Sequence, residues 1–519
     1  MVITFRRILI FFLIFFACLR SVEASSVHLY LHTKPLTLDP RRTGERRTQL
    51  ILRELFEGLT RIDKEGKPSL ALARSFDISP ESLQYTFTLR ESYWSNGLPL
   101  TAHDFEWTWK SILDPEFASP VAHFLFFIKN GLKAHLGQCS LDQVGVKALD
   151  AHTLLITLEH SSSSVFELLS NPVFSPVCSA IAKKDPHWHE KTPSQYISNG
   201  PFILKEYDIQ SRITLEKNPS YWDINCKRID TINFSIIEDA ATAFALFQKG
   251  ELDWYGDPCG IIPIECAQQL SPQLVTHSAG GLYLLVCSSQ NPLLNPKVRQ
   301  AIASAINRKQ LCRFINGGET PALSLLPNLS SELSFSDNSP LKAKQLLDEG
   351  CAEMNITKDQ FPPLVISHWA ESTSRIIAQL LQAQLRASLG IDVQLAGYDW
   401  SSYVKKLYSG DFDLITAAHN PTTQDPLSQI EYIHTFFWKD DQFKILIDKA
   451  KRCSSRSTPY IQQAEQLLSK HLPIIPLYSL RFKYAKAKGL QGEALSPIGA
   501  IELKEVEWLP STIAYTKEN

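Results

Sequence analysis

The chain has 519 residues, of which 44% are hydrophobic and 20% charged, and its formal net charge is −2. This composition is typical of a globular protein, and the near-neutral charge disfavours a nucleic-acid-binding protein, which needs a basic surface. The length exceeds that of one ordinary domain, so we expect two or three lobes.

The first residues have the pattern of an export signal. Arg6 and Arg7 precede an apolar run, Ile8–Leu19, that is too short to span a bilayer, and Val22–Ala24 offers small residues for cleavage. We therefore predict a signal peptide over residues 1–24. Two alternatives stay open: lipidation at Cys18, which follows a poor match to a lipobox, and a buried hydrophobic helix. No later stretch approaches eighteen apolar residues, so no membrane span is expected after the leader.

Cysteine usage gives little information about the fold. The chain has ten cysteines, and nine remain once residues 1–24 are removed. They are scattered without a C-x-x-C pair, so a disulfide framework is not expected to build this fold. Individual pairings stay open.

The first half of the chain contains two predicted strands, Tyr85–Leu89 and Leu154–Leu158, in which apolar and polar residues alternate. Asn96-Gly97 is predicted to form a turn, because glycine tolerates positive φ. Asp104 precedes a Phe- and Trp-bearing amphipathic segment and is expected to be its N-cap. In the second half of the chain, a helix is expected to begin at Pro296, since proline suits the first helical turn.

The second half continues with alternating helices and strands. An apolar stripe at helical spacing predicts a helix over Ser372–Leu389, and Gly390 is placed to end it. A strand over Ile391–Leu395, a helix over Ser401–Leu407 and a strand over Leu414–Ala417 are expected to follow. This succession predicts an α/β protein with a mixed or parallel sheet covered by helices.

Motifs for catalysis or metal binding are nearly absent. The sequence contains no G-x-S-x-G, P-loop, G-x-G-x-x-G or H-E-x-x-H motif. His187 and His189 form the one close histidine pair, but no Cys or acidic cluster lies beside them, so surface histidines are favoured over ligands. We therefore expect no metal, no cofactor and no enzymatic activity. A catalytic triad of distant residues stays open, since triads are recognised by geometry.

Sequence blocks in a fixed order extend along nearly the whole chain after the leader. They are Leu36–Pro40, Glu54–Leu59, Gly66–Pro68, Leu72-Ala73, Tyr85–Arg90, Trp94–Gly97, Leu100–Phe105, Val144–Thr153, Asn199–Phe202, Leu215–Pro219, Tyr221-Trp222, Val298–Ile302, Ala305–Arg308, Leu389–Val393, Gly410–Asp413, Asp425-Pro426 and Pro473–Tyr478. In order and spacing these blocks resemble the oligopeptide-binding proteins of ABC importers, the dipeptide, oligopeptide and nickel-binding type of family 5. The run from Tyr85 to Phe105 is the strongest match.

The resemblance implies a two-lobed clamshell of the periplasmic-binding-protein type with an extra N-terminal subdomain. The implied boundaries are a signal peptide at 1–24, lobe I at 25–60, 186–280 and 479–519, the extra subdomain at 61–185, and lobe II at 281–478. In this family the lobes close on an extended peptide, whose main chain is held by strand-like hydrogen bonds while wet pockets accept varied side chains.

The resemblance also implies where the ligand binds, and here this chain departs from the family. The family Asp that holds the ligand's α-amino group corresponds to Thr422, three residues before Asp425-Pro426, and an Arg of larger-peptide binders corresponds to Thr416. Trp400 matches a pocket Trp, whereas His419 replaces another. Asp425 is the first substitute anchor, with Glu371 and His368 as weaker ones. The predicted ligand-binding residues are Trp400, Thr416, His419, Asn420, Thr422 and Asp425.

The expected function is therefore that of an exported, periplasmic solute-binding component of an ABC importer. Its expected partners are a peptide or peptide-like ligand, including modified ones such as muropeptides, and the importer's permease subunits, with the protein itself a monomer. Because both charged anchors are missing, generic peptides are expected to bind weakly. The alternatives are a non-transport peptide-binding role, a non-peptide ligand of the same superfamily, and a hydrolase on this scaffold.

Overall fold

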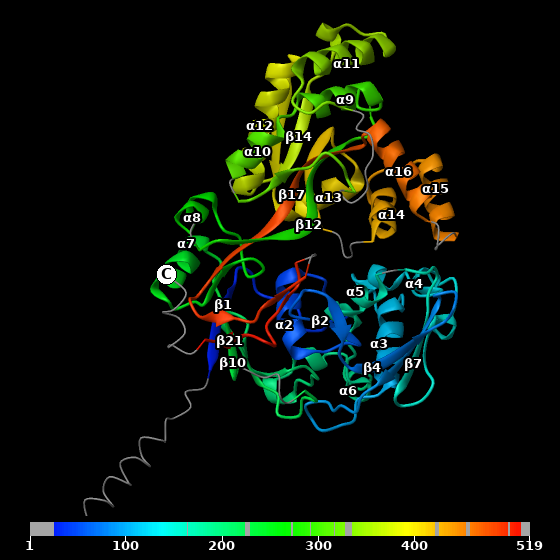
Figure 1. Ribbon diagram of the computed structural model, residues 1–519, viewed down its shortest axis with the longest axis vertical. Coiled ribbons are helices and arrows are strands. Elements are labelled where there is room, and N and C mark those ends of the chain that lie inside the picture. The colour runs from blue at the N-terminus through cyan, green and yellow to red at the C-terminus, as the bar shows by residue number, and fades with distance from the viewer. Residues whose placement is uncertain are drawn as a thin grey trace, which may run out of the picture.

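The computed structural model describes residues 25–509 except 163, 224–228, 271–272, 291, 316, 327–334, 421–424, 453–456 and 497–498. The predicted signal peptide, with Cys18, and Thr422 lie outside the described residues. The described chain forms two lobes (Figure 1). We call residues 25–280 and 479–509 the lower lobe and residues 281–478 the upper lobe. The finer boundaries expected from the sequence stay a prediction.

One part of the lower lobe is a four-stranded sheet in the order β1-β10-β9-β8. β1 runs parallel to β10, and the other neighbours are antiparallel. In β10, Ile232 and Phe234 are buried and alternate with less buried neighbours, as expected for a strand with one covered face. The elements here are β1 (Ser26–Leu31), β8 (Phe202–Asp208), β9 (Arg212–Lys217), β10 (Thr231–Ile236), α2 (Arg46–Leu55), α7 (Ala240–Lys249) and α8 (Ile264–Gln269).

A second, antiparallel sheet of the lower lobe has the order β4-β5-β7-β6. Helix α3 contacts its strands β6 and β7. The elements of this part are β2 (Thr60–Ile62), β3 (Pro68–Leu70), β4 (Ala73–Ile78), β5 (Gln84–Leu89), β6 (Val146–Ala148), β7 (Thr153–Thr157), α3 (Ala102–Leu113), α4 (Gly131–His135), α5 (Val165–Leu169) and α6 (Ser179–Ala182).

The expectation that Asp104 is the N-cap of α3 is wrong. Thr101 is the N-cap, and Asp104 lies three residues later, where its Oδ2 accepts the backbone N–H of Thr101 at 3.0 Å. Its other oxygen accepts the N–H of Ser179 at 3.0 Å. The carboxylate thus closes a capping box and also ties α3 to α6, a contact that local sequence does not reveal.

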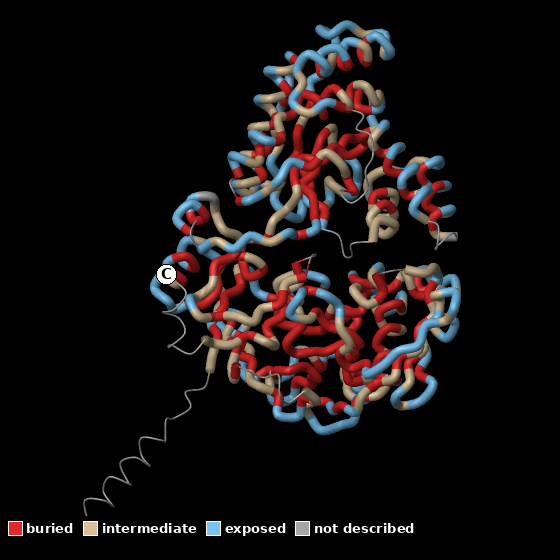
Figure 2. Tube along the Cα trace, in the orientation of Figure 1, coloured by how far each residue is buried: buried red, intermediate tan, exposed pale blue. Residues whose placement is uncertain are grey.

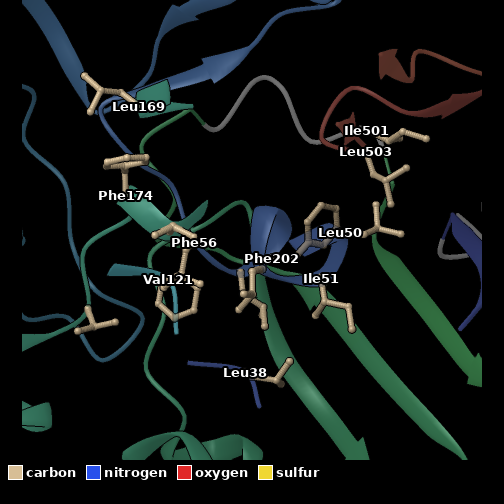
Figure 3. Close-up of a cluster of buried hydrophobic side chains, with 14 of the residues drawn as sticks. Leu38, Leu50, Ile51, Phe56, Val121, Leu169, Phe174, Phe202, Ile501 and Leu503 are labelled. Carbon is tan, nitrogen blue, oxygen red and sulfur yellow. The ribbon is translucent and has the colours of Figure 1, made fainter. Parts of the chain in front are cut away.

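One hydrophobic core joins both sheets of the lower lobe and includes residues from both ends of the described chain. Figure 3 shows part of it: Leu50, Ile51 and Phe202 lie near Ile501 and Leu503 from the chain's last segment. The lower lobe therefore cannot complete its core without residues that lie near the C-terminus. The last short strands are β18 (Leu490–Gln491), β19 (Ala494–Leu495), β20 (Ile501–Glu502) and β21 (Glu507–Trp508).

The upper lobe contains most of a seven-stranded sheet in the order β11-β17-β12-β16-β14-β15, with β13 paired to β17. Two separate hydrophobic clusters cover its faces: Leu285 belongs to one and its neighbour Leu284 to the other. Successive side chains of a strand point to opposite faces, so the sheet is buried on both sides. Figure 2 shows the buried chain concentrated inside each lobe.

The strands of this sheet are β11 (Trp254–Gly256), β12 (Val275–Cys287), β13 (Thr320–Pro321), β14 (Leu364–Trp369), β15 (Val393–Tyr398), β16 (Leu414–His419) and β17 (Ile474–Lys486). β14 is parallel to both β15 and β16, whereas β12 is antiparallel to β16 and β17. The helices are α9 (Pro296–Ala305), α10 (Arg308–Ile315), α11 (Pro340–Glu353), α12 (Ser372–Leu389), α13 (Trp400–Ser409), α14 (Pro426–Phe436), α15 (Asp441–Arg452) and α16 (Thr458–His471).

Strands β12 and β17 pass between the lobes side by side (Figure 1). At the lower end Val275 pairs with Tyr484, and at the upper end Val286 pairs with Ile474. The ladder is interrupted midway by a bulge that places residues 279–281 opposite Leu480. Gly280 has φ 64°, a conformation that favours glycine. The two lobes are thus joined by a two-stranded ribbon with an irregular middle.

Most predicted elements are confirmed, with small shifts. The helix Ser372–Leu389 has the predicted ends, and Gly390 follows it at φ 67°. The next strand is β15, which begins at Val393, two residues after the predicted start. The helix predicted at 401–407 begins one residue earlier, because Asp399 caps it by accepting the N–H of Ser402. Gly97 adopts the positive φ expected of the turn.

The seven cysteines in the described part of the chain are all free: Cys139, Cys178, Cys259, Cys266, Cys287, Cys312 and Cys351. Within the same residues, no helix combines the length and apolar character needed to cross a bilayer.

Candidate ligand site between the lobes

A cavity of about 650 Å³ lies between the two lobes. The upper lobe contributes Trp400, at the start of α13, and Asn420, directly after β16. The lower lobe contributes Leu50, Val121 and Ile501, which belong to its hydrophobic core and are labelled in Figure 3, together with polar side chains. A molecule in this cavity would contact both lobes at once.

The lower wall carries more positive than negative groups. Arg46, Arg47 and Arg53 line the cavity, all from α2, and Asp257 is the carboxylate among the lining residues. α2 begins at Arg46 because Glu45 caps it, its Oε2 accepting the N–H of Thr48 at 2.7 Å. Arginine is charged at all ordinary pH values, so this wall favours anionic groups.

Behind α2 lies a buried network of ion pairs that fixes the lower wall. Nη1 of Arg53 lies 2.9 Å from Oε1 of Glu502, and Arg61 pairs with Glu502, with Glu57 at 3.5 Å and with Glu54 at 3.8 Å. Burial, with Glu502 beside it, raises the pKa of Glu54 to about 7 despite the opposing charge of Arg61. The network attaches α2 to the strand β20, which carries Glu502.

The upper wall is aromatic. The Trp400 side chain is 58% exposed, although a large apolar ring is normally buried. Its ring centroid lies 5.1 Å from that of Trp369 and 5.7 Å from that of Tyr403. Tyr403 is held in turn because its hydroxyl donates to the carbonyl of Thr416 at 2.7 Å. Trp400 is thus a supported aromatic surface that faces the cavity and can cover part of a ligand.

Thr416 and His419 belong to β16, which ends directly before the lining residue Asn420, but neither of them lines the cavity. Their exposed fractions are 1% and 8%. Among the described residues neither ring nitrogen of His419 has a hydrogen-bond partner, and the ring stacks on Tyr432 with centroids 4.8 Å apart. Burial lowers the pKa of His419 to about 4, so the imidazole is neutral at pH 7. The position at which the resemblance implies an aromatic ring is thus filled by a neutral aromatic group.

Comparison with known proteins identifies the chain. The model of "Bacterial extracellular solute-binding proteins, family 5 Middle" matches residues 67–439. The chain belongs to this family. It is 30% identical to the oligopeptide-binding protein OppA of Bacillus subtilis over 498 residues, which cover 92% of this chain and 91% of that protein. It is 27% identical to the periplasmic murein peptide-binding protein MppA of Escherichia coli over 482 residues, 88% of each.

A solved structure agrees with this assignment. The periplasmic oligopeptide-binding protein OppAIV from Borrelia burgdorferi matches with a TM-score of 0.80 and 25% identity, over 93% of this chain and 100% of that one. The predicted two-lobed α/β fold and the predicted family are therefore confirmed.

The acidic residues proposed as substitute anchors of this solute-binding protein are helix caps. Asp425 accepts the N–H of Ser428 at 3.1 Å at the start of α14. Glu371 accepts the N–H groups of Thr373 at 2.8 Å and Ser374 at 3.0 Å at the start of α12. His368 is buried, with Nδ1 2.7 Å from the carbonyl of Trp369. Ligand binding by these residues, and by Thr422, stays a prediction.

The two histidines noted in the sequence lie apart from the cavity lining. His187 is exposed, with Nδ1 3.2 Å from Glu190, and His189 is half-buried. Over the described part of the chain, no group of three or more His, Cys, Asp or Glu side chains could hold a metal ion.

Sequence reasoning missed the arginines of the lower wall. Arg46-Arg47 follows a similar pair, Arg41-Arg42, and local sequence does not distinguish them. In the structure Arg41 is buried and pairs with Asp39 at 2.7 Å, whereas Arg46 and Arg47 line the cavity. The available signal was that Arg46-Arg47 begins an amphipathic helix, whereas Arg41-Arg42 lies before it.

Proposed function

We propose that this family 5 solute-binding protein is exported and captures peptides or peptide-like ligands, including modified ones such as muropeptides, for the permease of an ABC importer. The observation that carries the proposal is a cavity lined by Trp400 and Asn420 of one lobe and by Arg46 and Leu50 of the other. OppA of B. subtilis and MppA of E. coli are named for oligopeptide and murein peptide binding, which supports a ligand of this class.

Capture works by closure of the lobes around the ligand. The ribbon of β12 and β17 bends at its bulge, where residues 279–281 lie outside the regular ladder. Contacts that both walls make together exist only in the closed form, so the ligand shifts the equilibrium toward it. The permease then distinguishes the closed, loaded protein from the open one, and the protein acts as a monomer.

The test uses the full chain and whatever peptide-like molecule mass spectrometry identifies in protein from its native source. Small-angle scattering should show a smaller radius of gyration when this molecule is added at 100 times its Kd, with about 2.7 kcal/mol of added stability. An unchanged radius at saturation contradicts closure. A bound molecule without amide-linked amino acids contradicts the peptide class.

Trp400 offers a test by mutation. Trp400→Ala removes the aromatic upper wall and should weaken binding of that ligand about tenfold or more, because Trp anchors commonly contribute 2 kcal/mol or more. Phe314→Ala is the matched control: this ring is 53% exposed and belongs to the same lobe but does not line the cavity. Equal losses in the two variants would mean that Trp400 acts through stability and not through ligand contact.

Export is tested on the native protein by intact mass. A mature form that begins at Ser25 supports cleavage after residue 24, and a diacylglyceryl group on Cys18 supports the lipoprotein alternative. A full-length product inside the cytoplasm contradicts export altogether.

A further inference from the structure

The two arginines that begin α2 face the cavity without a firm carboxylate partner. The guanidinium of Arg46 lies 4.6 Å from the ring centroid of Phe482, and among the described residues it forms no ion pair within 4.0 Å. Arg47 has one such pair, its Nη1 3.3 Å from Oε1 of the partly exposed Glu45. An ion pair of this kind contributes at most about 1 kcal/mol, so Arg47 can exchange it for a ligand.

The acidic neighbour of Arg46 is already bound elsewhere. Oδ2 of Asp257 accepts the N–H of Lys483 at 3.0 Å, and the N–H of Asp257 donates to the carbonyl of Lys483 at 2.8 Å. Burial raises the pKa of Asp257, and the opposing effects of that N–H and of Arg46 do not cancel the increase. Burial likewise lowers the pKa of Arg46, with Asp257 opposing the change. Asp257 is thus bound by a backbone N–H, whereas the half-buried Arg46 has no carboxylate within ion-pair distance among the described residues.

The remaining walls do not compensate this positive charge. Arg53 is paired with Glu502 at 2.9 Å, and the upper-lobe lining residues Trp400 and Asn420 are uncharged. Within the described lining, Arg46 and Arg47 therefore outnumber the single carboxylate of Asp257. An anionic group of a ligand placed here meets two guanidinium groups and no competing acid from the opposite wall.

We propose that Arg46 and Arg47 bind a carboxylate of the ligand, so that the acidic end of the ligand is held by the lower lobe and not from position 416. The inference rests on the proposed function, since it names the chemistry that the same cavity recognises. Guanidinium groups present forked N–H donors that match a carboxylate. The carboxylate is either the C-terminus of a peptide or an acidic side chain.

The competing explanation is that Arg46 only packs on Phe482, since the long arginine side chain can cover apolar surface. A packing role affects all ligands equally. A carboxylate-binding role affects acids and leaves the corresponding amides unchanged, so a comparison of matched acids and amides separates the two explanations.

The experiment uses a degenerate tetrapeptide library made once as free acids and once as C-terminal amides. The full chain is equilibrated with each library, and bound peptides are quantified by mass spectrometry after ultrafiltration. A charge-assisted contact predicts about a ten- to hundredfold preference for the acids. If the carboxylate comes from a side chain, the bound amides should instead be those that contain Asp or Glu.

Substitutions of single arginines test which residue causes the preference for free-acid peptides. Arg46→Gln should remove most of it, and Arg46→Lys should retain part, because the charge remains but the fork is lost. Arg42→Gln is the matched control: Arg42 also stacks on a ring, 4.2 Å from that of Phe117, but it lines a different cavity. It should leave the preference unchanged. Melting temperatures of all variants show whether each one is folded.

The possible outcomes distinguish failure of the carboxylate site from failure of peptide capture. Peptide capture in which amides without Asp or Glu bind as well as the acids overturns the carboxylate site and leaves peptide capture intact. A preference for acids that Arg46→Gln and Arg42→Gln reduce equally assigns the effect to something other than this site and also overturns the inference. No capture from either library overturns tetrapeptide capture itself, and the inference fails with it.

Discussion

Buried polar groups behind the two walls of the cavity differ in charge and in hydrogen-bond partners. Behind the lower wall, Arg53 and Arg61 are buried with Glu54, Glu57 and Glu502, and most of these charges have partners. Behind the upper wall, His419 is buried with both ring nitrogens unpartnered within the described residues, and it stays neutral. The buried groups behind the lower wall are thus compensated charges, whereas His419 behind the upper wall avoids charge.

The contributions of Glu54 and His419 to folding stability change in opposite directions when the pH falls. The pKa of Glu54 is raised in the folded state to about 7, so protonation favours the folded lower lobe. The pKa of His419 is lowered to about 4, so protonation favours the unfolded upper lobe. Acidification should increase the stability that Glu54 contributes to the lower lobe and decrease the stability that His419 contributes to the upper lobe.

The largest effect is expected from Arg61→Met. Removal of this guanidinium leaves the buried carboxylates of Glu54, Glu57 and Glu502 with too few partners, and loss of one member of a buried pair typically costs about 3–5 kcal/mol. Urea unfolding followed by circular dichroism measures the loss. The matched control in the upper lobe is Arg386→Met.

Arg386 forms an ion pair of 3.2 Å with Asp392, but both side chains are about half exposed. Loss of an exposed pair of this kind should cost less than about 1 kcal/mol. Similar losses for Arg61→Met and Arg386→Met would show that the buried network does not hold the lower lobe together.

His419→Phe tests the upper lobe. In the unfolded chain the histidine has its ordinary pKa of 6.5 and in the folded protein about 4, so stability is full above pH 6.5 and falls as the pH drops toward 4. This difference corresponds to about 3 kcal/mol. Hydrogen exchange of upper-lobe peptides, corrected for the intrinsic pH dependence of exchange, should show this loss in wild type and not in the variant. A wild-type upper lobe that is insensitive to pH contradicts a neutral, buried His419.

Glu54→Gln tests the opposite response in the lower lobe. The folded-state pKa is raised from 4.5 to about 7, so the stability of this lobe should be full below pH 4.5 and fall as the pH rises to 7. This shift, which already includes the opposing effect of Arg61, corresponds to about 3 kcal/mol. Glutamine keeps an acceptor for the N–H of Leu503, so the variant should lose the pH dependence and retain the fold. If exchange in both lobes changes with pH in the same direction, the contrast between them is wrong.

The smallest effect concerns the ligand. Thr422 corresponds to the family position of an aspartate that binds the ligand's amino group, so Thr422→Asp should strengthen binding of free-amino peptides about tenfold, as expected for one charge-assisted contact. Calorimetry with a small peptide panel and its N-acetylated copies measures this. Tight binding by wild type that acetylation abolishes would mean that another acid holds the amino group.

Elements that are determined by nearby residues could be predicted from the sequence. The helix Ser372–Leu389 follows from its apolar stripe, and its end follows from Gly390, which adopts φ 67°. The strand after it was placed two residues too early, since Ile391 continues the apolar pattern although the ladder begins at Val393. Asp104 is not the cap of α3, because Thr101 is the N-cap and the Asp104 carboxylate, three residues later, closes a capping box. Its second partner, Ser179, lies 75 residues away and could not be inferred.

Only part of the candidate site could be predicted from the sequence. The resemblance pointed to Trp400 and Asn420, which line the cavity, but also to Thr416 and His419, which do not. The buried network could not be inferred, because Arg61 and Glu502 are 441 residues apart and charge alone does not reveal which of many acids and bases meet. Such pairings are set by how the two ends of the chain fold together.

That pairing of the two ends has a consequence for the order in which the two lobes fold. Residues 281–478 contain the whole upper lobe, whereas the lower lobe needs Glu502 for Arg53 and Arg61, and Ile501 and Leu503 for its core. The upper lobe can therefore fold before the last residues of the chain are in place, but the lower lobe, which comes first in the sequence, cannot. Its arginines stay uncompensated until the segment that carries Glu502 is in place, so the lobe that contains the first described residues is the last to become native.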